Sequence, residues 1–145
     1  MRRAAALLLA AAFALGAPAF VGAAQTALAS TTLNLDLDGD GVPDRVTLTQ
    51  GNGEAIVRVA FAARSHPAQR FSFPVDPGRE DAVCALPVRL RAESLDYDPA
   101  PALGAALEGF VRSKTAHGFA LVDERCDAIH FYWNHRTRRL AWWRA

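Results

Sequence analysis

After residue 30 the chain repeatedly alternates apolar and polar residues, and this pattern constrains the fold more than any other feature. Leu33, Leu35 and Leu37 alternate with polar neighbours within residues 31–37. The same period of two recurs at residues 45–49, 55–62 and 70–75, and strand-like composition recurs at 119–122, 128–133 and 140–143. Because successive side chains of a strand point to opposite faces of a sheet, this period predicts strands that each bury one face.

The segments between these stretches have the composition of turns. Gly51-Asn52-Gly53 and Asp76-Pro77-Gly78 are rich in residues that favour tight turns. Residues 134–139 join the last two predicted strands and are expected to close a C-terminal hairpin. Residues 82–95 also look extended, and Pro87 places part of that stretch at a sheet edge because proline cannot donate a ladder hydrogen bond.

One helix is expected near the middle of the chain. Asp98 followed by proline resembles a helix start, and Leu103, Leu107, Phe110 and Val111 then recur at helical spacing. Two glycines within this stretch weaken the pattern. The expected fold class is therefore α+β: mainly antiparallel β-sheet with one short helix, in a single domain.

The N-terminus has the layout of a secretory signal peptide. Arg2 and Arg3 precede an uninterrupted apolar run over residues 4–15, and small residues follow it. A membrane-spanning helix is the alternative, but it needs about 20 mostly apolar residues, and glycine and proline interrupt the continuation. Cleavage is expected after Ala29, at the end of an Ala-x-Ala site, and Val21-Gly22-Ala23 is an earlier candidate.

Removing residues 1–29 leaves a mature chain over residues 30–145, expected to lie in the periplasm or to be secreted, with no transmembrane anchor. The full chain of 145 residues is 51% hydrophobic with a net charge of +1. Without the apolar leader and its arginines, the hydrophobic share becomes ordinary for a globular domain and the charge turns slightly negative. This balance argues against a nucleic-acid binder, which is strongly basic.

Cys84 and Cys126 are expected to form a disulfide. An exported protein folds in an oxidising compartment, where an even number of cysteines favours pairing over a metal or catalytic role. A reactive thiol is the alternative, but the chain has no Cys-x-x-Cys pair. The cross-link would stabilise the fold by roughly 4 kcal/mol through the entropy of the unfolded chain.

The strongest chemical signal is a short loop rich in acidic residues. Asp36, Asp38, Asp40 and Asp44 occupy its positions 1, 3, 5 and 9, and Gly41 permits a sharp turn. Alternate spacing turns successive carboxylates inward as the loop curls, and at close range their charges repel unless a cation neutralises them. The pattern predicts Ca²⁺, which takes about six to eight oxygen ligands. A solvated Asp/Gly turn is the alternative.

Residues 36–48 resemble the calcium-binding loop of FG-GAP (integrin-alpha-like) and VCBS repeats, in which Asp-x-Asp-x-Asp-Gly-x-x-Asp precedes a strand. The resemblance implies that the calcium ligands are Asp36, Asp38, Asp40, the Val42 carbonyl and Asp44. It implies a metal-binding loop and not a propeller, because the chain carries one copy and no FG…GAP segment precedes it. An EF-hand would need glutamate where Thr47 stands. As a whole, the chain is similar to small exported bacterial proteins.

Aromatic and basic residues gather at the C-terminus, where all three tryptophans follow residue 132. Strand alternation places Phe131 and Trp133 on one face, which is expected to join the core. The other face supplies a candidate binding surface that consists of Tyr132, Arg138, Trp143 and Arg144. These residue types dominate protein interfaces, and they also stack on sugars and hold anionic groups. Packing in the core, together with aromatic pairs across the strands, is the favoured interpretation of these rings.

No nucleophile elbow, zinc-protease helix or glycine-rich phosphate loop occurs in the sequence. The acidic and histidine residues between Asp123 and His130 are the best hydrolase candidates, but such residues more often form a solvated turn. No catalytic residue is therefore assigned. We expect an exported, calcium-stabilised module that binds an envelope protein or ligand. Binding of a cell-wall glycan is the first alternative, and a small secreted hydrolase is the second.

Overall fold

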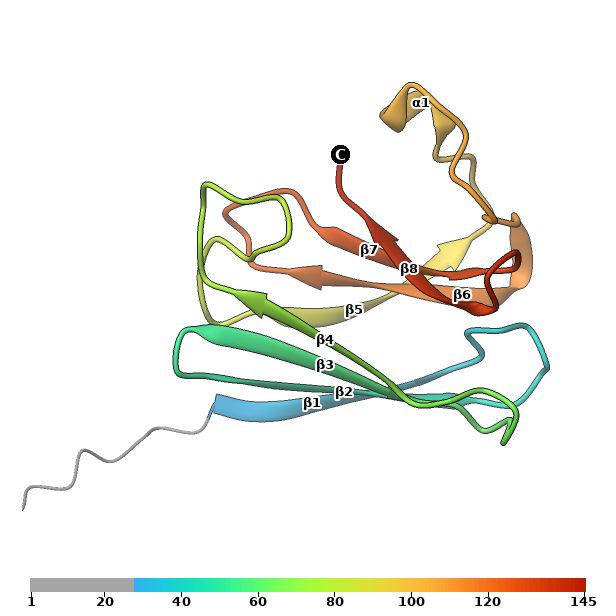
Figure 1. Cartoon of the computed structure of the whole chain (residues 1–145), viewed down its shortest axis with the longest axis horizontal. Helices are drawn as coiled ribbons and strands as arrows, with labels where there is room; N and C mark the ends of the chain where they lie inside the picture. Colours follow the sequence, from blue (N-terminus) through green and yellow to red (C-terminus); the bar gives the residue numbers. More distant parts are fainter. Residues whose placement is uncertain (1–27) are drawn as a thin grey trace, which may run out of the picture.

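The computed structural model describes residues 28–145, so the predicted signal peptide lies almost wholly outside the described residues. Two antiparallel sheets of four strands each face one another in this range (Figure 1). The first contains, in order, β1 (Leu28–Leu35), β2 (Asp44–Gly51), β3 (Glu54–Ala60) and β4 (Gln69–Pro74). The second contains β5 (Arg89–Leu95), β6 (Ser113–Val122), β7 (Ile129–Asn134) and β8 (Arg139–Trp143). No helix in the described range is long and apolar enough to cross a membrane.

The turn between β2 and β3 shows how local sequence sets the strand register. Gly51 pairs with Glu54, which leaves Asn52 and Gly53 as a two-residue loop. Both loop residues have positive φ angles, 51° and 78°, as a type I′ turn requires, and Asn-Gly is the preferred pair for that turn. The predicted turn is thus present, and its register brings the apolar residues of β2 and β3 to one face.

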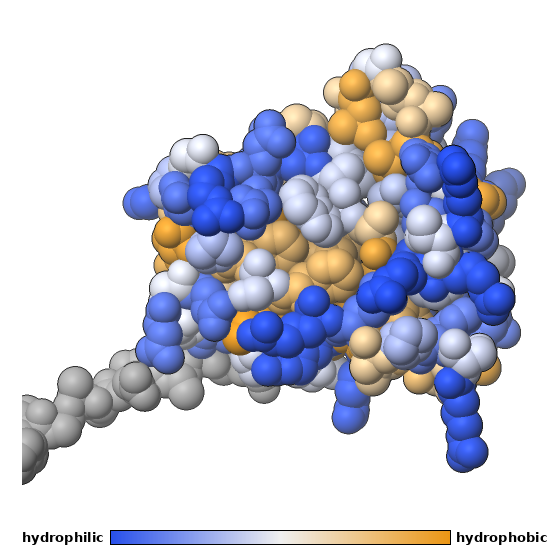
Figure 2. Space-filling view, in the orientation of Figure 1, coloured by the Kyte–Doolittle hydropathy of each residue, from blue (hydrophilic) through white to orange (hydrophobic). Residues whose placement is uncertain are grey.

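The two sheets bury a common hydrophobic core. Val46 and Val57 of the first sheet are fully buried and belong to the same cluster as Phe119 and Phe131 of the second. The rings of Phe119 and Phe131 stack with their centroids 4.4 Å apart, and Phe71 meets Phe131 edge-on at 5.2 Å. Figure 2 shows apolar surface along the seam between the sheets, with hydrophilic side chains around it.

The expected helix is much shorter than the sequence pattern indicates. Within the described residues, the helix α1 spans Ala100–Leu103 and ends at Gly104, which adopts a left-handed conformation with φ 70°. Leu107 and Phe110 follow in irregular backbone and pack against the second sheet from there. Their helical spacing is therefore not used by a helix, and the fold is mainly antiparallel β-sheet with this single helical turn.

The irregular segment after α1 is held by side chains of β7. The Tyr132 hydroxyl and the Asn134 side-chain amide both donate to the Glu108 carbonyl at 3.0 Å. A Cβ atom at Gly109 would collide with the Asn134 side chain. These contacts outweigh the weak helical propensity of a segment that contains two glycines.

The sulfur atoms of Cys84 and Cys126 lie at bonding distance, with their Cα atoms 6.0 Å apart. The even cysteine count therefore predicted the pairing correctly. The bridge connects the segment before β5 to the turn between β6 and β7. It staples two parts of the chain that are separated by 42 positions.

Candidate functional sites

The acidic loop joins β1 to β2 and brings three of its four aspartates together. Ligand oxygens of Asp36, Asp38 and Asp40 all lie within 4.8 Å of one another. Backbone N–H groups of the loop hold these carboxylates in place. Asp36 accepts from Gly39 and Gly41 at 2.8 and 3.0 Å. The curl expected from the alternate spacing is present.

Asp38 carries the least satisfied charge of this group. Its side chain is only 2% exposed, and its Oδ2 atom is buried without a hydrogen-bond partner. The imidazole of His66 lies beside it, with Nε2 3.5 Å from Oδ2. A buried carboxylate oxygen without a donor is costly unless a cation compensates it.

Asp44 has a different environment from the other three aspartates. It is 1% exposed, and its two oxygens accept the backbone N–H groups of Leu37 and Ala62 at 3.1 and 2.8 Å. Burial raises the pKa of Asp44, and the two backbone donors oppose that rise only in part. Asp44 thus ties the loop to the end of β3. Val42 is exposed, and its N–H donates to Asp40.

The donor set of this loop fits a hard divalent cation. Three carboxylates with free lone pairs and an unpartnered buried oxygen are the chemistry that Ca²⁺ coordinates. His66 lies beside the loop and would supply a nitrogen to softer metals. The sequence offered no signal for His66, since it comes from the loop after β3.

The structure places the four residues of the expected C-terminal binding surface in four different environments. Tyr132 is buried, and Phe110 covers its ring at a centroid distance of 5.6 Å. Arg138 lies in the turn between β7 and β8, beside a hollow that the acidic loop also lines. The Arg144 guanidinium donates to the carbonyls of Glu80 and Ala82 at 3.2 and 2.9 Å. Arg144 therefore anchors the chain end.

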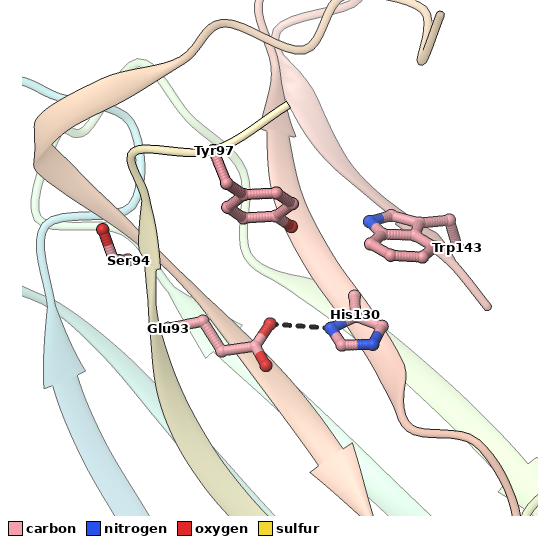
Figure 3. Close-up of a pocket in the computed structure, with 5 residues that line it drawn as sticks. All are labelled: Glu93, Ser94, Tyr97, His130 and Trp143. Carbon is pink, nitrogen blue, oxygen red and sulfur yellow. Dashed lines mark hydrogen bonds and ion pairs between the residues drawn. The ribbon is translucent and has the colours of Figure 1, made fainter. Parts of the chain in front are cut away.

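Trp143 lines a pocket of about 320 Å³ on the outer face of the second sheet, together with Glu93, Tyr97 and His130. Figure 3 shows the rings of Tyr97 and Trp143 on opposite sides of the pocket, above Glu93 and His130. The indole stacks on the His130 imidazole with the ring centroids 4.3 Å apart. Alternation within the C-terminal strands did not identify Glu93 or Tyr97. Glu93 lies on β5 and Tyr97 follows it, and β5 is the edge strand opposite β8.

The polar floor of this pocket is a hydrogen-bonded pair of side chains. Nδ1 of His130 lies 2.8 Å from Oε2 of Glu93, and Arg91 donates to the other oxygen at 2.9 Å. Burial alone would raise the pKa of Glu93, but these two partners outweigh it and lower the pKa. Glu93 is thus ionised at neutral pH and fixes the orientation of the imidazole.

The hydrolase candidates do not assemble around a nucleophile in the described structure. Asp123 is engaged by backbone N–H groups, and Asp127 is exposed. His130 is paired with Glu93, and Ser94 also lines the pocket, but its hydroxyl accepts the N–H of Asp96. The described residues thus form a pocket whose imidazole is oriented by Glu93.

No protein family, curated protein or solved structure that was compared with this chain matches it.

Proposed function

We propose that this protein is an exported, calcium-stabilised module that acts by binding an envelope protein or ligand and catalyses no reaction. One observation carries the calcium part of the proposal: three aspartates converge within 4.8 Å, and Oδ2 of the buried Asp38 has no hydrogen-bond partner. A bound cation would compensate that charge and remove the mutual repulsion of the carboxylates.

Calcium would act here as a structural cross-link. The loop already contacts the segment after β3 through the hydrogen bond from Ala62 to Asp44 and through the proximity of Asp38 and His66. A ligand that binds only the folded state stabilises it by about 1.4 kcal/mol at ten times its dissociation constant. The millimolar calcium outside cells is adequate for sites with dissociation constants of roughly 10⁻⁴ to 10⁻³ M.

The pocket on the outer face of the second sheet supports the binding role. Tyr97 and Trp143 offer aromatic surface around a pocket with an ionised Glu93 at its floor. Aromatic residues beside charged groups are typical of protein recognition sites. The basic and apolar N-terminus, which is typical of a secretory leader, supports an extracytoplasmic partner.

A cell-wall glycan is the second candidate ligand for the same pocket. Tyr97 and Trp143 could stack on the apolar faces of a sugar ring, while Glu93 and His130 bind its hydroxyl groups. One face of the indole is already covered by His130, so stacking would use the other face.

Calorimetric titration with CaCl₂ tests the calcium site. The wild-type protein is expected to bind one calcium ion and to melt at a higher temperature in its presence. The Asp40→Ala variant is expected to show neither effect, and Asp98→Ala, an aspartate outside the loop, serves as the control. A wild-type protein that neither binds calcium nor melts at a higher temperature with it would refute the proposal.

The partner is identified by an interaction screen in calcium and again in chelator. Recovery of one envelope protein without retention on isolated peptidoglycan supports the first candidate. Retention on peptidoglycan that Trp143→Ala abolishes and Val111→Ala preserves supports the glycan. Turnover of generic ester, phosphate or glycoside substrates that is lost in His130→Ala would contradict a purely binding role.

A further inference from the structure

Three arginines share the outer face of the first sheet. Arg58 of β3 lies directly opposite Arg70 of β4. Arg45 of β2 is one diagonal step away, because Arg58 faces Thr47, two residues further along β2. Side chains that are directly opposite have Cβ atoms about 5 Å apart, and diagonal neighbours about 7–8 Å. The register therefore concentrates three exposed positive charges in one small area.

These charges lack the acidic partners that other arginines have. Among the described residues, ion pairs are formed by Arg79, Arg89, Arg91, Arg112 and Arg136. Within the same range, Arg45, Arg58 and Arg70 form none, and Arg58 donates only to the Thr49 hydroxyl, at 3.1 Å. Like charges that face each other across a sheet are destabilising. An anion from outside the chain would reverse that effect.

A hollow of about 390 Å³ lies among these arginines and fits a small molecule. Besides the three arginines, apolar residues such as Val59, Ala60 and Ala68 line it. In Figure 2, hydrophilic side chains project from the lower side of the molecule, which the first sheet forms. The hollow is thus lined by both basic and apolar residues.

We propose that this hollow binds a phosphate monoester whose organic part is apolar. Guanidinium groups donate paired hydrogen bonds to phosphate oxygens, and a dianionic phosphate compensates three arginines better than a single carboxylate does. The apolar wall would contact the organic part of the ligand. The site lies on the first sheet, apart from the Glu93 pocket on the second, and it does not require calcium.

Calorimetric titration with phenyl phosphate tests the proposal, with phenol and inorganic phosphate as companion probes. Saturable binding of phenyl phosphate is expected, with weaker binding of inorganic phosphate and none of phenol. Arg58→Gln and Arg70→Gln are each expected to weaken binding by about tenfold or more. Arg139→Gln, an exposed strand arginine of the other sheet, is expected to leave it unchanged.

Three results would overturn this assignment. The first is an absence of phenyl phosphate binding by the wild-type protein. The second is an equal loss of affinity in Arg139→Gln, which would indicate a general charge effect. The third is cosedimentation with anionic phospholipid vesicles without binding of phenyl phosphate, which would assign the basic face to a membrane surface. The substituted side chains are exposed, so each variant is expected to remain folded. Melting curves of the variants verify this.

Discussion

The backbone N–H of Cys84 donates a 2.5 Å hydrogen bond to Oδ2 of Asp123, although 39 positions separate the two residues. The other oxygen of the same carboxylate accepts the N–H groups of Arg125 and Cys126 at 3.0 and 2.9 Å. One carboxylate therefore organises the backbone at both ends of the disulfide. Burial alone would raise the pKa of Asp123, but the backbone donors outweigh it and hold the pKa below its ordinary value.

Asp123→Asn is expected to lower the free energy of unfolding at pH 7 by about 1.5–3 kcal/mol, because hydrogen bonds to a charged acceptor are lost. The folded pKa is below the ordinary value of 3.8. The contribution is therefore complete above that value and is lost as pH falls through the folded pKa. Urea unfolding at pH 7 and at about pH 2 should show a difference between wild type and variant that narrows in acid. The exposed Asp127→Asn is the control, and a difference that stays constant with pH would contradict the prediction.

Reduction of the disulfide is expected to destabilise the protein by roughly 4 kcal/mol, because the cross-link restricts the unfolded chain. Denaturant unfolding with and without a reducing agent measures the effect. A variant with both Cys84→Ser and Cys126→Ser should match the reduced protein and should not respond to the reducing agent. A wild-type protein with equal stability under both conditions would show that the cross-link is energetically neutral.

Asp38→Asn is expected to have opposite effects without and with calcium. Without the ion, the substitution removes a buried charge next to Asp36 and Asp40, so the melting temperature should rise. With calcium, the variant lacks a ligand, and the rise that calcium causes in the wild type should disappear. Thermal denaturation in chelator and in calcium measures both effects. If the variant is less stable than wild type in chelator, the carboxylate has a structural role that needs no ion.

Gly118→Ala is expected to destabilise the second sheet by about 1–3 kcal/mol, as overpacking does in other cores. A Cβ atom at this position would lie 2.5 Å from the Phe131 carbonyl oxygen and 2.9 Å from the Leu95 side chain. The carbonyl belongs to the backbone of β7, so relief requires movement of a strand. Gly78→Ala is the matched control, because its nearest contact would be 3.4 Å. Equal stability of the two variants in urea unfolding would contradict the packing argument.

Most of the strand pattern could be predicted from the sequence, because alternation and turn residues act over a few neighbouring positions. The Asn52-Gly53 turn and the inward residues of β2 and β3 follow from such local rules. The predicted helix is present but much shorter than its sequence pattern indicates, because contacts between distant residues decide where it ends. Leu107 and Phe110 have helical spacing, but contacts with β7 hold that segment in irregular backbone.

The candidate sites also differ in whether the sequence alone predicts them. The acidic loop is visible in the sequence because its aspartates are neighbours, and local N–H donors are enough to bring three of them together. The Glu93–His130 pair joins residues 37 positions apart. Its formation depends on the pairing of β5, β6 and β7 into one sheet, which no local pattern encodes.

Thus the amino-acid order alone established a β-rich chain, a paired set of cysteines and an acidic loop, since each depends on chemistry that nearby residues or simple counts reveal. Only the three-dimensional fold showed that Asp44 accepts two backbone hydrogen bonds and that the buried Oδ2 of Asp38 has no hydrogen-bond partner. It also brought three arginines together on the outer face of the first sheet. Those features arise from burial and strand register, which exist only when distant parts of the chain pack together.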